Sequence, residues 1–155
     1  MADGPRDAYI DALKMLGRRE LSEAQVRQRL ARRGHAPDAV DAAVTRLRAE
    51  RAIDDARVAE AIVRTQSSIR GRGKLRVLRQ IESAGIAEAT ARRAVDEVFG
   101  GLNSDALLEA WLAKRLRGHQ QVADEAEFAR LYRYLIGQGF EPDRIILALK
   151  ARSVK

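Results

Sequence analysis

The pattern of apolar and polar positions repeats three times along the chain. Three segments align without a gap: VRQRLARRGHAPDAVDAAV from Val26, VLRQIESAGIAEATARRAV from Val77 and LYRYLIGQGFEPDRIILAL from Leu131. Each has an apolar pair four residues apart and a glycine four residues later: Val26, Leu30 and Gly34; Val77, Ile81 and Gly85; Leu131, Leu135 and Gly139. Because residues four apart share one helix face, each segment predicts an amphipathic helix that ends at its glycine.

A second helix is predicted after each glycine and a further one before each aligned segment. Apolar residues recur at equal offsets after the glycines, as on one helix face: Val40, Ala43 and Val44; Ala91, Ala94 and Val95; Ile145, Ala148 and Leu149. Pro37 and Pro142 stand at equivalent places where a helix can begin. Upstream lie the helical patterns DAYIDALKMLGRR, DARVAEAIVRTQSS and DALLEAWLAKRL. Each repeat therefore comprises three helices.

The fold class predicted from this pattern is all-α. Three tandem three-helix repeats are expected to stack into an elongated, curved body, because such repeats contact mainly their neighbours. The predicted boundaries are a flexible tail at 1–6, repeats at 7–53, 54–98 and 105–155, and a linker at 99–104. The linker is marked by FGGLNS, whereas ERAIDD leaves only a tight junction between the first two repeats.

Capping residues mark several helix starts. Ser22 with Gln25 forms a predicted capping box, flanked by a hydrophobic staple of Leu21 and Val26. Ile53, Asp54 and Val58 repeat the staple around an N-cap. In the third repeat, Ser104 is a predicted cap, as is Asp124 with Glu127 three residues later.

The composition limits the kind of partner and the cellular compartment that we expect for this protein. The formal net charge is +7 and the sequence pI is about 10.3, which favours an anionic partner. The chain contains no cysteine, which excludes disulfides and thiolate chemistry and suits a reducing compartment. It also has no signal-like apolar region and no apolar stretch of membrane-spanning length. We expect a cytoplasmic protein that makes no membrane contact.

The stretch SIRGRGKLRVLRQI, residues 68–81, has the densest positive charge. No acid occurs from Ala61 to Ile81, and the predicted contact residues are Arg70, Arg72, Lys74, Arg76 and Arg79. A nucleotide-binding P-loop needs a preceding strand and Ser or Thr after the lysine, and this stretch has neither, so we do not favour that interpretation. Binding of an anion at the N-terminus of the helix that begins at Lys74 is still an alternative. Leu75, Leu78 and Ile81 are predicted to form the core stripe of this helix.

The equivalent helix of the first repeat is also basic. Its candidate contact residues, with those of the preceding turn, are Arg18, Arg19, Arg29, Arg32 and Arg33. A charge run is commonly only a solvated face, but its recurrence on equivalent helices makes a binding surface an equal alternative.

Other candidates for chemistry have structural interpretations. Asp54 and Asp55 are better explained by capping and the helix dipole than as a catalytic pair. His35 and His119 lack a ligand pattern, so we expect no metal. Trp111 is in register with core leucines, whereas Tyr132 and Tyr134 could be buried or exposed. No nucleophile, base and electrophile come together, so we expect no catalysis and no cofactor.

Taken in order and spacing, the motifs resemble the RecX family, the bacterial regulators of RecA recombinase. The resemblance covers about Ala12 to Lys150 and rests on three stretches: RRELSEAQVRQRLARRGH, AIDDARVAEAIVRTQSSIRGRGKLRVLRQIESAGI and FARLYRYLIGQGFEPDRIILAL. The sequence departs from the family's habit at Gln25 and Gln80, at Val58, and at Gly137 with Gln138, where the family often has a basic pair. The last departure weakens a charge-based role for the third repeat.

The resemblance implies a non-enzymatic protein that lies in the groove of the RecA filament on single-stranded DNA. Such a protein would mainly inhibit RecA's ATPase, recombinase and coprotease activities, and so act in DNA repair, recombination and the SOS response. The resemblance also implies a monomer, with weak direct contact to single-stranded DNA at most. On this view the basic stretch contacts the filament groove.

Two alternatives remain open. The first is a helical-repeat protein that binds duplex DNA through its basic surface, although PDAVDAAVTRL offers few base-reading side chains and Asp38 and Asp41 would repel phosphate. The second is a helical adaptor whose charge serves solubility only.

Overall fold

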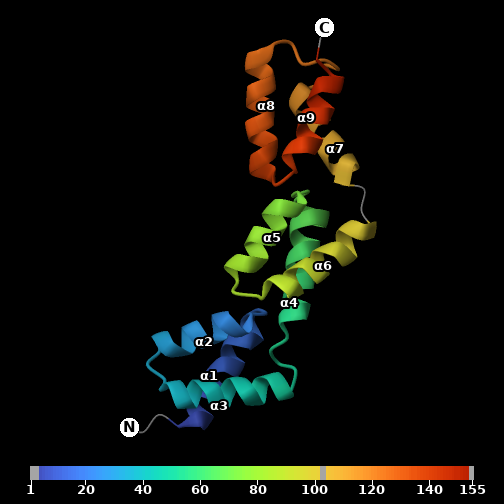
Figure 1. Cartoon of the computed structure of the whole chain (residues 1–155). Coiled ribbons are helices and arrows are strands. Elements are labelled where there is room, and N and C mark those ends of the chain that lie inside the picture. Colours follow the sequence, from blue (N-terminus) through green and yellow to red (C-terminus); the bar gives the residue numbers. More distant parts are fainter. Residues whose placement is uncertain (1–3, 102–103, 154–155) are drawn as a thin grey trace. The chain divides into compact units, whose positions relative to one another are not determined.

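The computed structural model describes residues 4–101 and 104–153. In these ranges the regular elements are all helical, as the sequence predicts, and a lone bridge joins Val122 and Ser153 (Figure 1). The helices are α1 (Pro5–Arg18), α2 (Glu23–Arg32), α3 (Pro37–Ala49), α4 (Asp55–Val63), the π-helical η1 (Arg64–Ile69), α5 (Lys74–Ser83), α6 (Glu88–Gly101), α7 (Ser104–Leu116), α8 (Glu125–Gln138) and α9 (Pro142–Ala151). Within this part of the chain, no helix is long and apolar enough to cross a membrane.

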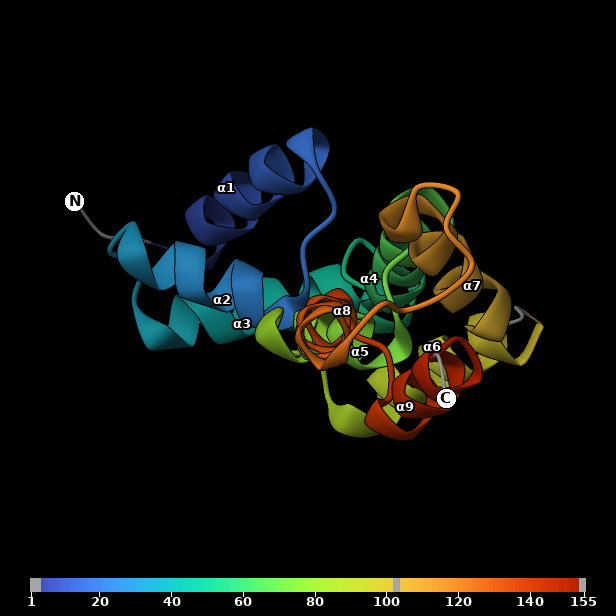
Figure 2. The same cartoon turned by 90° about the horizontal axis from the view of Figure 1, so that it is seen from above.

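The chain divides into two compact units. The first comprises 1–61 and 81–91, and the second comprises 62–80 and 92–155. In the first unit, α1 packs on α3 and α2 packs on both, and Figure 2 shows these three helices grouped together. Their core includes the fully buried Leu21, Val26, Leu30, Val44 and Leu47.

The second unit contains the C-terminal three-helix group. α8 packs against α9, and α7 packs against both (Figure 1). The core is formed by apolar faces that meet between these helices, and its most buried members are Leu112, Leu135, Ile145 and Leu149.

The predicted helix ends are confirmed by the backbone. Gly34, Gly85 and Gly139 have positive φ angles of 89°, 76° and 98°. Few side chains tolerate this left-handed conformation, which explains the glycine at each site. Pro37 and Pro142 are the first residues of α3 and α9.

Most of the predicted caps are also confirmed. The Ser22 hydroxyl accepts the Gln25 N–H at 3.1 Å, and the Gln25 side chain accepts the Ser22 N–H at 3.0 Å. Asp54 accepts the Arg57 N–H at 3.2 Å, and Asp124 accepts the Glu127 N–H at 2.8 Å. Ser104, predicted as a cap, is instead the first helical residue of α7.

Some element boundaries differ from the predictions. Residues 1–3 of the predicted tail and 102–103 of the predicted linker lie outside the described residues. α1 already begins at Pro5, because the Asp7 carboxylate accepts the N–H of Gly4 at 3.3 Å and closes the first turn. α6 continues to Gly101, beyond the half-buried Phe99. The helix predicted over DARVAEAIVRTQSS changes to π geometry at Arg64.

The predicted core stripe of α5 is wrong at one position. Leu75 is 39% exposed, whereas Val77 and Ile81 are fully buried. The buried face is centred on this pair, which is four residues apart, so Leu75 lies at its edge and Leu78 is half-buried.

Candidate functional site

The turn before α5, residues 70–73, is shaped by two glycines within the second unit. Gly71 has a φ angle of +65°, a conformation that glycine adopts at little cost. Gly73 is buried against the C-terminal end of α8: a Cβ added there would lie 2.5 Å from the carbonyl carbon and oxygen of Gly139. The glycines of GRGK therefore allow close backbone packing.

Hydrogen bonds hold this turn against α7 and α8. The N–H of Gly73 donates to the Gln138 carbonyl at 2.8 Å, and the N–H of Leu75 donates to the Gly139 carbonyl at 3.0 Å. The indole N–H of Trp111 donates to the Gly71 carbonyl at 2.8 Å. These bonds also give partners to carbonyl groups that the end of α8 leaves unpaired.

Two of the predicted contact arginines also bond to the end of α8. The Arg72 guanidinium donates to the side-chain oxygen of Gln138. Arg76 donates to the carbonyl of Gly137 at 3.0 Å. Cations at a helix C-terminus are stabilised by the helix dipole, so Arg72 and Arg76 have a structural role in addition to their charge.

Four of the predicted arginines form one electrostatic group, which we call the arginine cluster: Arg70, Arg72, Arg76 and Arg79. Burial lowers the pKa of the Arg76 guanidinium, and the charges of Arg72, Arg79 and Arg70 lower it further. Arg70 and Arg79 are exposed, whereas Arg72 and Arg76 are half-buried. An anion that bound here would relieve the mutual repulsion of these charges.

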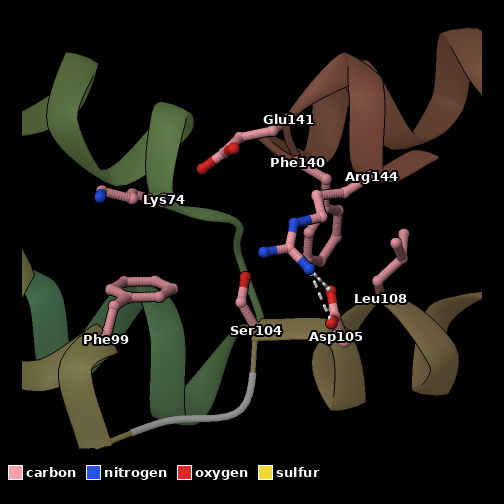
Figure 3. Close-up of a pocket in the computed structure, with 8 residues that line it drawn as sticks. All are labelled: Lys74, Phe99, Ser104, Asp105, Leu108, Phe140, Glu141 and Arg144. Atoms are coloured by element: carbon pink, nitrogen blue, oxygen red, sulfur yellow. Dashed lines mark hydrogen bonds and ion pairs between the residues drawn. The ribbon is translucent and has the colours of Figure 1, made fainter. Parts of the chain in front are cut away.

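Lys74 has an acidic partner of its own. Its ammonium group is 3.5 Å from the Asp96 carboxylate on α6. Lys74 lines a pocket of about 300 Å³ whose buried floor is formed by Leu108 and Phe140. Figure 3 shows Lys74 and Phe99 at one side of this pocket and the ion pair of Arg144 with Asp105, at 2.9 Å, at the other. Its charged groups are mixed in sign, and they form no nucleophile–base arrangement.

The predicted arginines of the first repeat lie in the first unit. Arg18, Arg19, Arg32 and Arg33 are exposed and Arg29 is half-buried. Arg33 lies 3.5 Å from Asp11. They occupy the end of α1, the last turn of α2 and the residues that follow each.

The candidates that were given structural interpretations have specific partners. Asp54 is an N-cap, as predicted, whereas the Asp55 carboxylate accepts the N–H of Glu23 at 2.9 Å and so caps α2. His35 lies 2.6 Å from Asp11, and this hydrogen bond lowers the pKa of the Asp11 carboxyl. Across the described ranges, no group of three or more His, Asp and Glu side chains could hold a metal ion.

Sequence reasoning missed the role of two aromatic residues. Trp111 is half-buried beside the core and makes an edge contact with Tyr134, with ring centroids 5.9 Å apart. The Arg115 guanidinium lies 3.7 Å from the centre of the Tyr134 ring, and the Lys114 ammonium lies 5.5 Å from that of Trp111. Trp111 and Arg115 are four residues apart, so the sequence indicates that they share one helix face. Only the fold shows that both contact Tyr134 of α8.

Comparisons with known proteins agree on one family. Residues 8–47 match the family model described as RecX, first three-helix domain. The chain is 33% identical over 151 residues to the regulatory protein RecX of Halorhodospira halophila, covering 97% of this chain and 89% of the relative. It is 35% identical over 141 residues to that of Chromohalobacter salexigens, covering 91% and 88%. The crystal structure of RecX from Lactobacillus salivarius shares the fold, with a TM-score of 0.76, 21% identity and 97% of both chains covered.

Proposed function

This chain belongs to the RecX family, and from that premise we propose that it binds the RecA filament on single-stranded DNA. In this proposal the protein acts as a non-enzymatic regulator in the cytoplasm. It mainly inhibits the ATPase, recombinase and coprotease activities of RecA, and thereby limits recombination and the SOS response. The relatives named above are regulatory proteins, which supports a regulatory role.

The arginine cluster is the observation that carries the proposal. Burial lowers the pKa of Arg76, and the other three guanidinium groups of the cluster are close enough to lower it further; no acid occurs between Ala61 and Ile81. A filament that carries DNA presents phosphates and carboxylates, which are the acceptors that guanidinium groups bind best. Arg70 and Arg79 are the exposed members of the cluster, so we assign filament contact chiefly to them.

The other predicted contact residues have a smaller part in the proposal. Arg18, Arg19, Arg29, Arg32 and Arg33 would add a second basic surface if the three-repeat organisation presents equivalent helices to the filament. Many modest contacts made by one monomer would then add up across neighbouring RecA subunits. Lys74, paired with Asp96, contributes least.

The test is RecA's DNA-dependent ATP hydrolysis with this protein titrated from substoichiometric to equal ratio. We expect inhibition below one molecule per RecA. Replacing Arg70 and Arg79 together by alanine should raise the half-inhibitory concentration about tenfold, because each loses a charged contact. The matched control replaces Lys74 and Arg93, an exposed residue of α6, by alanine. It removes two charges outside the arginine cluster and should change inhibition little.

Two outcomes would contradict the proposal. No inhibition at equal ratio, together with tight binding to duplex DNA, would favour the alternative DNA-binding function. Equal losses in the Arg70/Arg79 and Lys74/Arg93 variants would show that inhibition depends on net charge and not on the arginine cluster. Far-UV circular dichroism of each variant separates loss of contact from loss of fold.

A further inference from the structure

A further basic surface lies on α7 and α8, in the repeat where Gly137 and Gln138 weaken the expectation of charge-based binding. We call it the α7–α8 band and define it by Trp111, Lys114, Arg115, Arg130 and Tyr134. Arg115 and Lys114 lie against the rings of Tyr134 and Trp111. Lys114, Arg115 and Arg130 are exposed. In the part of the chain that the structure describes, none of the three makes an ion pair with a carboxylate.

The α7–α8 band continues toward the arginine cluster within the same unit. Arg130, Tyr134 and Gln138 follow one another at intervals of four residues and so share one face of α8. Gln138 accepts a hydrogen bond from Arg72, and Trp111 donates one to Gly71. Cations therefore follow α8 from Arg130 to the turn before α5, with aromatic rings between them.

A pocket of about 330 Å³ lies in the middle of the α7–α8 band. It is lined by Arg115, Glu127, Arg130, Leu131 and Tyr134. Apolar and aromatic walls, two guanidinium groups and one carboxylate suit a flat heterocycle with polar edges that is linked to phosphate. A nucleobase in a duplex cannot enter such a pocket, whereas an unstacked base can.

Glu127 gives the pocket a preference for ligands that donate a hydrogen bond. One of its carboxylate oxygens accepts the N–H of Ala123 at 2.7 Å. The other oxygen can accept a hydrogen bond from a ligand in the pocket. Cytosine, adenine and guanine carry exocyclic amino groups that donate such a bond. Thymine can donate only through its ring N3–H, which lies between carbonyl oxygens that the carboxylate repels.

We propose that the α7–α8 band binds single-stranded nucleic acid, with one base beside Tyr134 and Glu127 and the adjoining phosphates on Arg115 and Arg130. The pocket favours an amino-bearing base over thymine. A nucleotide offers phosphates to the two arginines and a flat ring with an amino donor to Tyr134 and Glu127, whereas an acidic side chain offers only a carboxylate, which Glu127 repels. The inference deepens the proposed function, on which its biological use rests, by naming a direct contact to the DNA of the filament.

The experiment measures fluorescence anisotropy of labelled oligo(dC) and oligo(dT) of about 12 nucleotides, within the site sizes of single-strand binders. RecA is absent, so failure of this inference and failure of RecA inhibition are distinguishable. We expect oligo(dC) to bind about threefold or more tightly than oligo(dT), because no carbonyl oxygen that repels Glu127 lies beside the amino group of cytosine. Replacing Arg115 and Arg130 by alanine should weaken binding of both about tenfold, whereas Arg93→Ala should leave both nearly unchanged.

The conservative variant Glu127→Gln tests the base contact itself. Its amide oxygen can still accept the Ala123 N–H, and its NH2 group would then point toward the ligand. The preference should shift toward oligo(dT), whose base carries carbonyl acceptors. Equal binding of both oligonucleotides by the native protein and by Glu127→Gln would overturn the inference. So would displacement by poly-glutamate as effective as by unlabelled oligonucleotide, which would assign the band to an acidic protein.

Discussion

Each compact unit contains a glycine that is packed so closely against a neighbour that a side chain would collide with it, but the neighbouring groups differ. In the first unit, a Cβ added to Gly85 would lie 2.5 Å from the Cβ of Ala24, and the nearby Ser22 hydroxyl donates to the Ala84 carbonyl. In the second, a Cβ added to Gly73 would lie 2.5 Å from the carbonyl group of Gly139. The first neighbour is a side chain and the second is backbone.

This difference decides how much each contact can vary. A side chain that obstructs Gly85 can be shortened by mutation, whereas the backbone opposite Gly73 cannot. The first contact lies beside a bond between a hydroxyl and a carbonyl group, whereas two guanidinium groups donate bonds beside the second. The position of the arginine cluster therefore depends on a contact with little tolerance for change.

The largest expected effect is that of Gly73→Ala. The added methyl group must displace the end of α8, and it would break the bonds from Gly73 to Gln138 and from Leu75 to Gly139. We expect a loss of about 3 kcal/mol in the free energy of unfolding, the upper range for overpacking, measured by urea denaturation. Gly137→Ala is the control: it has open space around it and should be neutral or slightly stabilising. Equal stability of both variants would refute the tight contact.

A smaller loss is expected for Gly85→Ala, and part of it should be recoverable. The variant meets the Ala24 methyl group and places alanine at a φ angle of +76°, so we expect a loss of about 2 kcal/mol. Adding Ala24→Gly removes the collision but not the backbone strain. A double-mutant cycle in urea should therefore show favourable coupling between the two substitutions. Additive losses would mean that the two sites do not collide.

These contacts also mark the limit of what the sequence could predict. Gly34, Gly85 and Gly139 were predicted as helix ends because a C-cap is a local feature of the chain. The packing of Gly73 on Gly139 joins residues far apart in sequence, and no local pattern records it. The bond from Glu23 to Asp55 is missed for the same reason, since Asp55 also fits an ordinary first-turn acid.

The same limit applies to the candidate site: features that are local in the sequence could be predicted, and features that depend on packing could not. Clustering of basic residues could be predicted because the arginines are close in sequence, and the structure brings Arg70, Arg72, Arg76 and Arg79 together. The sequence could not predict that Arg72 and Arg76 bond to α8 whereas Arg70 and Arg79 are exposed. This division depends on acceptor groups at the end of α8. Gly137 and Gln138, which depart from the family's habit, accept bonds from Arg76 and Arg72. A basic pair there would repel both arginines.

The smallest expected effect is a difference in pH dependence between the two regions. Burial alone would raise the pKa of Glu23, beside the first contact, but bonds and charges from Arg48 and Arg27 outweigh it and lower the pKa. The stabilisation from Glu23 is therefore complete above the ordinary carboxyl pKa of about 4.3 and is lost as pH falls through the lowered value. Relative to Glu23→Gln, the native protein should lose up to about 1 kcal/mol of unfolding free energy on acidification.

The second contact provides the comparison for this measurement. Arg72 bonds to the Gln138 amide and Arg76 to the Gly137 carbonyl, and none of these acceptors titrates in acid. A double-mutant cycle of Arg72→Ala with Gln138→Ala, followed by urea denaturation, should therefore give the same coupling free energy at neutral and acidic pH. A coupling that weakens in acid as the Glu23 difference does would mean that a carboxylate also holds the turn before α5, and would remove the chemical distinction between the two contacts.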